Sequence, residues 1–135
     1  AEIARQYKSA GRNVVAVLQL DMTSYPGSGP LVIGNVDDFT SPWLRSYLVT
    51  INEASIGARL IADHCGYACS DHASWYRQGY PTLMPFESDT EHMNGQIHTE
   101  GDVVSSRTSF SHALAFAKIA VVMGMDLANS SEHQP

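Results

Sequence analysis

The sequence predicts an α/β fold in which helices flank a mixed, mostly parallel sheet, and two observations support this prediction. The apolar run at residues 13–22 shows no polar alternation, which is typical of a strand buried on both faces of a parallel sheet. Strands and helices also alternate along the chain, an order typical of an α/β sandwich rather than a helical bundle or an all-β barrel. No internal repeat or long linker divides residues 1–135, so we expect one domain or part of one.

The elements of the first half follow from apolar spacing and turn chemistry. Residues 1–10 carry apolar side chains at helical spacing and are followed by a glycine, which predicts a helix. The long strand comes next, and a turn dense in Gly and Pro at residues 24–30 leads into a short strand at residues 31–33. Ser41 followed by Pro42 is a common helix start and predicts a helix to about residue 53.

The second half continues the alternation of strands and helices. We expect a strand at residues 57–63 and a short helix at residues 71–78. A strand edge follows at residues 81–86, where prolines interrupt the pattern. Apolar residues at helical spacing between residues 107 and 128 predict one long closing helix.

Composition narrows the classes of partner. The 135 residues carry a formal net charge of -6, with only 8 Lys and Arg and no basic cluster, so the electrostatic footprint of nucleic-acid binding is missing. The longest apolar candidate for a membrane span, residues 119–125, is shorter than the roughly 18 to 20 residues required. We therefore expect neither a nucleic acid nor a membrane as partner. The chain starts at Ala1, with no initiator Met and no signal peptide, which predicts a processed or excised product.

Two residues about 75 positions apart are candidate metal ligands. Asp21 follows the long strand directly, and open α/β sheets bind ligands just beyond the carboxyl ends of their strands. His98 lies in a loop with Asp102 four residues further on, and a carboxylate commonly fixes the second ring nitrogen of a ligating histidine. From position alone, a turn or cap carboxylate and a solvated loop histidine remain the more common alternatives.

The two cysteines bracket a Gly-Tyr-Ala segment. Their C-x3-C spacing differs from the C-x2-C of zinc ribbons, and no second pair completes a structural zinc site. A disulfide between Cys65 and Cys69 is the better interpretation, and two free buried thiols are the alternative. A bond closing so short a loop contributes only about 2 kcal/mol, so its expected role is to make the loop rigid locally. It would also indicate an oxidising, extracellular compartment.

Four segments carry a resemblance to a known family. In order, they are residues 18–23 (Leu-Gln-Leu-Asp-Met-Thr), residues 65–75 around the cysteines, residues 84–88 (Met-Pro-Phe-Glu-Ser), and residues 97–99 (Ile-His-Thr) with Asp102. Together they resemble the C-terminal half of the secreted bacterial leucyl aminopeptidases, two-metal, zinc-dependent exopeptidases. The resemblance covers essentially the whole chain. It implies a three-layer α/β sandwich of the zinc-exopeptidase type, with residues 1–135 forming the C-terminal half of a single catalytic domain.

The resemblance also implies roles for individual residues. Asp21 matches the ligand that completes one zinc site, and His98 matches the ligand that completes the other. Ser70 resembles a residue of the family that lies near the metals without binding them. Asp102 would have a similar supporting position next to His98. The wall of the apolar pocket for the substrate's N-terminal side chain corresponds to Met22, Ile33, Cys65, Tyr67, Cys69, Met84, Phe86 and Ile97.

The resemblance implies two further features of the pocket. The disulfide would belong to the pocket floor, and Tyr67 could also touch the scissile carbonyl. Ordinary core packing is the alternative explanation for Met and Phe residues in such a set. Thr90 and Met93 stand where better-known members have aromatic residues, a departure that leaves the side-chain preference of the pocket open.

A larger departure from the family is an absence. The upstream H-x-D segment, a bridging aspartate and a Glu-Glu pair that includes the general base do not occur in this sequence. We therefore expect no catalytic residue in this chain and no activity from it alone. Activity would require the N-terminal half of the enzyme, so either that half is a separate or nicked chain that assembles with this one, or the sequence is a truncated product. The assembled enzyme would be a secreted zinc aminopeptidase that holds two zinc ions and removes hydrophobic, Leu-like N-terminal residues from peptides.

Three alternatives remain at the level of sequence. A glutaminyl cyclase of the same broad architecture would hold a single zinc ion and would carry Trp beside the final histidine, where this chain has Ile97. A non-catalytic binding domain would have kept the fold and lost the metals, although Asp21 and His98 are intact. A folded fragment without a function of its own is the third alternative.

Overall fold

The computed structural model describes residues 1–130, and its elements follow the predicted order. The sequence of elements is α1 (Glu2–Ser9), β1 (Val17–Leu18), β2 (Val32–Val36), α2 (Pro42–Ile51), the π-helical turn η1 (Asn52–Ile56), β3 (Arg59–Asp63), α3 (His72–Tyr76), β4 (Thr82–Leu83), β5 (Pro85–Phe86), the 3-10 turn η2 (Thr90–His92) and α4 (Phe110–Asn129).

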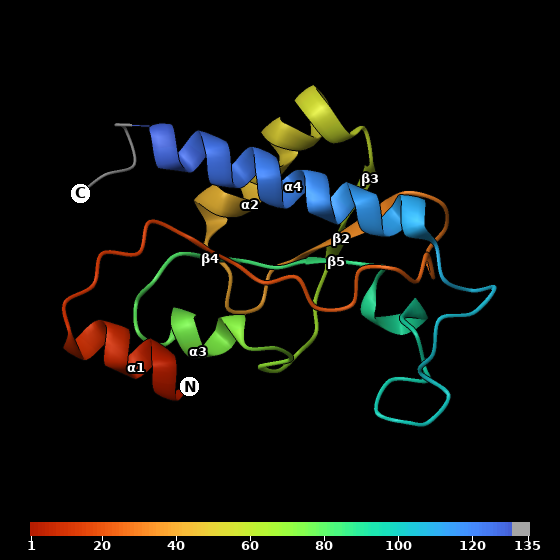
Figure 1. Cartoon of the computed structure of the whole chain (residues 1–135), viewed down its shortest axis with the longest axis horizontal. Coiled ribbons are helices and arrows are strands. Elements are labelled where there is room, and N and C mark those ends of the chain that lie inside the picture. Colours follow the sequence, from red (N-terminus) through yellow and green to blue (C-terminus); the bar gives the residue numbers. More distant parts are fainter. Residues whose placement is uncertain (131–135) are drawn as a thin grey trace.

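The helices form layers on the two sides of the strands. Figure 1 shows α2 and α4 together on one side and α1 and α3 on the other, with the strands running between them. This is the α/β sandwich that the alternation of elements predicts.

Two small groups of strands make up the middle layer. β1 pairs in parallel with β4, while β2 lies between β3, which is parallel to it, and β5, which is antiparallel. Gly34 allows β2 and β5 to approach, because a Cβ atom at this position would overlap the Ser88 carbonyl oxygen. The sheet is therefore mixed and mostly parallel, as the sequence predicts.

The long apolar run forms a much shorter strand than its composition predicts. Only Val17 and Leu18 are in β1, and both are half-buried rather than buried on both faces. The N–H groups of Val17 and Gln19 donate to the carbonyls of Pro81 and Leu83, at 2.8 and 2.9 Å. Among the described residues no strand pairs with the opposite edge of β1, so one side of this run has no ladder to extend it.

The main core lies between the strands and the layer formed by α2 and α4. Phe116 and Ile119 of α4 are almost fully buried there against Leu44 and Leu48 of α2 and Ile33 of β2. A second, smaller cluster contains Val36, Met84 and Phe86. The two clusters lie on different parts of the fold, and the smaller one lies at the candidate site.

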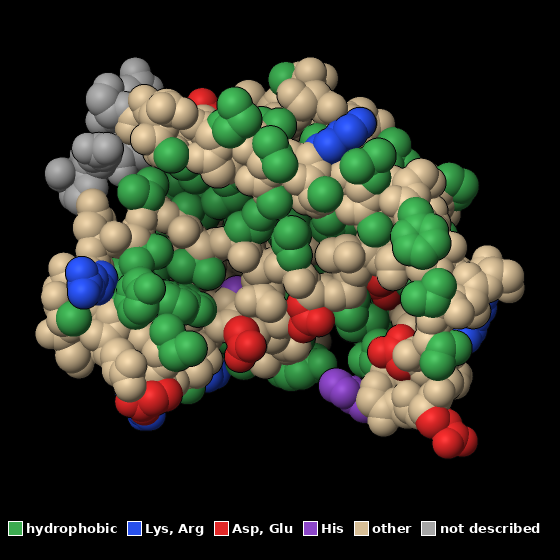
Figure 2. Space-filling model, viewed as in Figure 1, with side chains coloured by type: hydrophobic (Ala, Val, Ile, Leu, Met, Phe, Trp, Pro, Cys, Tyr) green, Lys and Arg blue, Asp and Glu red, His purple; other side chains and the backbone are tan. Residues whose placement is uncertain are grey.

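The last helix, α4, exposes an apolar face. It is long and apolar enough to cross a membrane by length and composition alone, unlike the shorter run seen in the sequence, but core helices meet the same criteria and one of its faces packs into the main core. Figure 2 shows hydrophobic side chains gathered over this helix. The most exposed of them are Phe110, Leu114, Val121 and Met125.

Candidate metal and substrate site

The two candidate ligands, far apart in the sequence, line the same cavity. Asp21 follows β1 and His98 lies in the long connection between η2 and α4, and both contribute to a cavity of about 170 Å³. A larger hollow of about 390 Å³ also contains Asp21, together with Ile97 and Asp102. The folded chain therefore brings a carboxylate and an imidazole to the edge of one concave region.

The Asp21 carboxylate is oriented by a hydrogen bond. The Ser70 hydroxyl donates to Asp21 Oδ2 at 2.7 Å. The next residue, Met22, has a φ of 64°, a left-handed conformation that is uncommon for a residue with a side chain. Such conformations cost free energy and persist where the surrounding structure imposes them, often at functional sites. Ser70, expected from the resemblance to lie near the metals, is thus in direct contact with a candidate ligand.

His98 is also in a left-handed conformation, with a φ of 63°, and its side chain is exposed. The turns around it are short-range, with hydrogen bonds from Thr99 N to Gln96 O and from Asp102 N to Thr99 O. Asp102 accepts a hydrogen bond from Asn94 Nδ2 at 3.0 Å. Among the described residues no hydrogen bond joins Asp102 to the His98 ring, so the expected orientation of His98 by Asp102 is not what the structure shows.

The apolar wall of the cavity contains most of the residues expected there. Met84 and Phe86 are buried at its base, and the partly buried side chains of Met22, Cys65, Cys69 and Met93 pack against them. The cavity lining also includes Tyr67, Thr90 and Ile97. Thr90 and Met93, which the sequence identifies as departures from the family, therefore face the same space as the other wall residues.

Ile33 lies elsewhere. It is fully buried in the main core, where it packs with residues of α2 and α4. The physical reason is the alternation of side chains along β2, which sends Ile33 towards the helical layer while Val36, three positions on, joins Met84 and Phe86. The expected place of Ile33 in the pocket wall is corrected accordingly.

Cys65 and Cys69 form a disulfide with a Cα–Cα distance of 6.4 Å, which confirms the expected pairing. The loop that they close contains Tyr67, whose side chain is 62% exposed. Asp38 Oδ2 accepts hydrogen bonds from the N–H groups of Cys65 and Gly66, at 2.6 and 3.3 Å. The disulfide loop is therefore attached to the end of β2 as well as being closed on itself.

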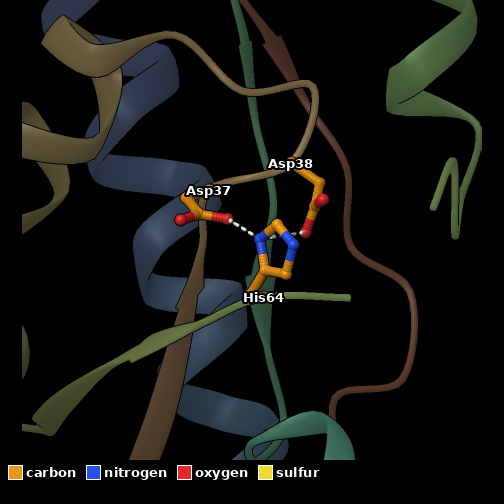
Figure 3. Close-up of side chains that lie close together, drawn as sticks. All are labelled: Asp37, Asp38 and His64. Carbon is orange, nitrogen blue, oxygen red and sulfur yellow. Dashed lines mark hydrogen bonds and ion pairs between the residues drawn. The ribbon is translucent and has the colours of Figure 1, made fainter. Parts of the chain in front are cut away.

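A histidine and two carboxylates lie beside this loop, as Figure 3 shows for Asp37, Asp38 and His64. His64 Nδ1 is 2.7 Å from Asp37 Oδ1 and 3.3 Å from Asp38 Oδ2. The hydrogen bond to Asp37 and the charges of both carboxylates raise the pKa of the His64 imidazole. Although the three ligand-type atoms lie within 4.8 Å of one another, Asp38 already accepts two backbone hydrogen bonds, so the cluster acts as an attachment of the loop.

Glu87 is the feature of the site that residue patterns missed. It follows β5 and is only 2% exposed, and its carboxylate accepts hydrogen bonds from three backbone N–H groups. Burial raises the pKa of this carboxyl group, while those hydrogen bonds oppose the rise. The available signal was a single Glu within the otherwise apolar segment Met-Pro-Phe-Glu, a residue type that is rarely buried without partners.

An α/β sandwich with a carboxylate and an imidazole at one apolar cavity defines a candidate metallohydrolase site, and comparison with known proteins gives the family. The model described as "Peptidase family M28" matches residues 1–120, and the chain belongs to this family.

Individual relatives agree with the family assignment. The chain is 37% identical over 131 residues to leucine aminopeptidase 1 of Phaeosphaeria nodorum, covering 93% of this chain and 33% of that protein. It is 37% identical over 132 residues to leucine aminopeptidase 1 of Uncinocarpus reesii, with the same coverage. The solved LapA aminopeptidase of Legionella pneumophila superposes with a TM-score of 0.90 at 30% identity, covering 95% of this chain and 34% of that one. The chain thus spans about a third of the length of these relatives.

Proposed function

We propose that this chain is the part of a zinc aminopeptidase that carries the substrate pocket and two metal ligands. One observation carries the proposal: Asp21 and His98, distant in sequence, line one cavity whose base is apolar. Membership of family M28 and similarity to proteins named leucine aminopeptidase support the reaction class. In this proposal residues 1–135 are the C-terminal part of a single catalytic domain.

The donors fit zinc. A carboxylate oxygen and an imidazole nitrogen are both donor types that zinc accepts, and each would complete the ligand set of one of two ions. When bound, the ions would supply Lewis acidity and a water activated near neutral pH. Ser70 would hold Asp21 in the orientation that ligation needs, since its hydroxyl already donates to Oδ2. Asp102 would act on His98 indirectly, because it accepts a hydrogen bond from Asn94 in the loop that carries His98.

The cavity would select the substrate. Met84 and Phe86 at the base, with Met22, Cys65, Cys69 and Ile97 around them, would favour a peptide whose N-terminal residue is hydrophobic and Leu-like in size. The exposed Tyr67 on the disulfide loop would lie where the scissile bond enters. The disulfide supports a secreted, oxidising location.

The remaining ligands and the general base would come from the part of the family fold that residues 1–135 do not include, a segment that lies N-terminal to them in the family. Two surfaces are suited to receive it. The opposite edge of β1 has no strand beside it among the described residues, and alternate N–H groups of a strand point to opposite edges. The apolar face of α4, which includes Leu114 and Val121, is exposed. Without that segment, this chain would bind peptide and metal weakly and would not turn over.

The test uses protein purified from its own host, so that any accompanying segment is retained. Hydrolysis of a leucyl anilide, sensitive to a zinc chelator, is the expected result. Asp21→Asn and His98→Asn should each lower kcat/KM at least 100-fold and reduce the zinc content. The matched variants Asp71→Asn and His92→Asn change exposed residues outside the cavity lining. Their kcat/KM should stay within threefold of the wild-type value.

Three outcomes would contradict the proposal. Host protein that contains no zinc and hydrolyses no aminoacyl anilide would indicate a metal-free binding module. Zinc content unchanged in both Asp21→Asn and His98→Asn would show that these side chains are not ligands. Turnover of an N-terminal glutaminyl peptide with ring closure, in place of hydrolysis, would point to cyclase chemistry.

A further inference from the structure

Glu87 contacts both of the segments that carry the candidate ligands. Its Oε2 accepts hydrogen bonds from the N–H groups of Ser24 and Tyr25, at 3.1 and 2.9 Å. Its Oε1 accepts from the N–H group of Asn94 at 3.4 Å. Ser24 is three residues after Asp21, and Asn94 is four residues before His98. One carboxylate therefore spans the gap between the two loops, with one oxygen for each.

The backbone of Glu87 is fixed independently of its side chain. His112, buried near the start of α4, bonds through Nε2 to the Glu87 carbonyl oxygen at 2.8 Å. Ser109 at the start of the same helix donates its N–H to Ser24 O at 2.8 Å. The end of β5, the loop after β1 and the first turn of α4 are thus joined around the Glu87 side chain.

Hydrogen bonds of this bridge stabilise the buried Glu87 carboxylate, and no described ion pair does. Within residues 1–130 the structure forms no salt bridge to Glu87, although a buried carboxylate is costly unless it is paired or accepts hydrogen bonds. Backbone N–H groups that donate to a carboxylate form stronger bonds than those between neutral groups. The described partners of this buried carboxylate are therefore the backbone N–H groups of the two loops.

We propose that Glu87 is a positioning residue that holds the Asp21 segment and the His98 segment in a fixed mutual register, through one carboxylate oxygen on each. This proposal rests on the proposed function, in which Asp21 and His98 each complete a zinc site. A metal site requires precisely placed ligands, and replacing a residue that orients a ligand typically lowers metal affinity by about 10–100-fold. Glu87 would act through these two segments, and its side chain also borders the hollow of about 390 Å³ that Asp21 lines.

The informative variant is Glu87→Gln, which keeps the shape and removes one acceptor. An amide offers a single acceptor oxygen, and its NH2 group would face either the Ser24 and Tyr25 N–H groups or the Asn94 N–H group. Amide hydrogen exchange of the full 135-residue chain should then accelerate at least tenfold on one side of the bridge. Amides of the main core, such as Ile119, should be unaffected. Glu91→Gln, an exposed change in the adjacent 3-10 turn, is the matched control.

Two results would overturn the proposal. Exchange rates at Ser24, Tyr25 and Asn94 within twofold of those in Glu91→Gln would show that the carboxylate does not hold these segments. Parallel acceleration of all core amides would show general destabilisation in place of a local bridge. Should Glu87→Gln fail to fold, Glu87→Asp still decides, because its shorter side chain keeps the charge but cannot reach both loops: exchange rates at Ser24, Tyr25 and Asn94 all within twofold of those in Glu91→Gln would refute the bridge.

A metal titration separates this proposal from the proposed function. In host-purified protein stripped of metal, Glu87→Gln should weaken zinc binding at least tenfold relative to Glu91→Gln. Glu87→Asp keeps both acceptor oxygens and should restore part of that affinity. Zinc affinity equal in Glu87→Gln and Glu91→Gln would overturn the positioning role. If the wild-type protein binds no zinc, the proposed function fails, while the exchange measurements still show whether the bridge exists.

Discussion

The two loops that carry the candidate ligands are held in place in very different ways. The Asp21 loop, residues 20–29, is bonded to distant parts of the chain: Ser70 contacts Asp21, Glu87 accepts from Ser24 and Tyr25, and Asp89 accepts from the Ser28 hydroxyl. The His98 loop, residues 93–109, is held mostly by its own turns. Its Thr99 side chain, for example, bonds to Gln96 O and to Gly101 N within the loop.

This difference separates a preorganised side of the site from an adaptable one. Hydrogen bonds from distant elements fix the position of the Asp21 loop relative to the rest of the fold. Local turns fix the shape of the His98 loop, and a few hydrogen bonds at its two ends fix its position relative to Asp21. Among the described residues, these hydrogen bonds include the Asn94 N–H bond to Glu87 at the start of the loop and the Ser109 N–H bond to Ser24 O at its end. The predictions below test this asymmetry.

The largest effect is expected from a methyl group placed between the Asp21 loop and η2. A Cβ atom on Gly27 would overlap the backbone carbonyl of His92, whereas a Cβ atom on Gly95, in the His98 loop, would meet no atom within 4 Å. Gly27→Ala should lower the free energy of unfolding by about 2 kcal/mol or more, as overpacking typically does. Gly95→Ala should change it by less than about 0.5 kcal/mol.

Chemical denaturation of the two variants measures both values. Equal and small changes would mean that the Asp21 loop adapts as readily as the His98 loop, and would remove the distinction drawn between them. Equal and large changes would mean that the His98 loop is as tightly packed as its partner.

A smaller effect is expected at Ser70. Ser70→Ala removes the donor to Asp21 Oδ2 without adding bulk, so the free energy of unfolding should fall by only about 1 kcal/mol. Zinc affinity of the host protein should fall more clearly, by roughly tenfold, since the ligand loses its orienting partner. Ser106→Ala, an exposed serine change in the His98 loop, serves as the control for both measurements.

The smallest effect is expected at His64, which is exposed. Its pKa is raised by the hydrogen bond to Asp37 and by the charges of Asp38 and Asp37, so its contribution to stability is fully present below the unfolded pKa of about 6.5. That contribution is lost as the pH rises through the raised folded value. The wild type should therefore exceed His64→Asn in Tm at pH 5 to 6, and the two should converge at pH 9.

Thermal unfolding across this pH range is the measurement. Burial lowers the pKa of His72, which gives the opposite pH dependence, but His72 is present in both proteins and cancels in the difference. A Tm difference that grows with pH would contradict a stabilising interaction of the His64 imidazolium with Asp37 and Asp38.

The sequence predicted the elements well where apolar spacing and turn residues were unambiguous. Pro42 marked the start of α2, and the spacing between residues 107 and 128 located α4 within a few residues. The strand predicted from the long apolar run was too long. Apolar residues form a strand buried on both sides only where neighbouring strands pair with them, and β1 has one neighbouring strand among the described residues.

Those features of the candidate site that depend on residue type alone could be predicted from the sequence. Two cysteines four positions apart can form a disulfide, and they do. Met84 and Phe86 were expected at an apolar cavity and lie at its base. Ile33 was not placed correctly, because a sequence of apolar residues does not say which face of a strand meets which layer.

By itself, the sequence determined the order of strands and helices, the closed disulfide loop and the chemical types of the candidate ligands, since these depend on residues near one another in the chain. Only the tertiary structure decided that Glu87 spans the two ligand loops, that Asp102 bonds to Asn94, and that Ile33 belongs to the main core. The physical reason is that a buried hydrogen bond or a packed face depends on which distant segments meet, and residues 24 and 87, which are bonded in this fold, lie 63 positions apart in the sequence.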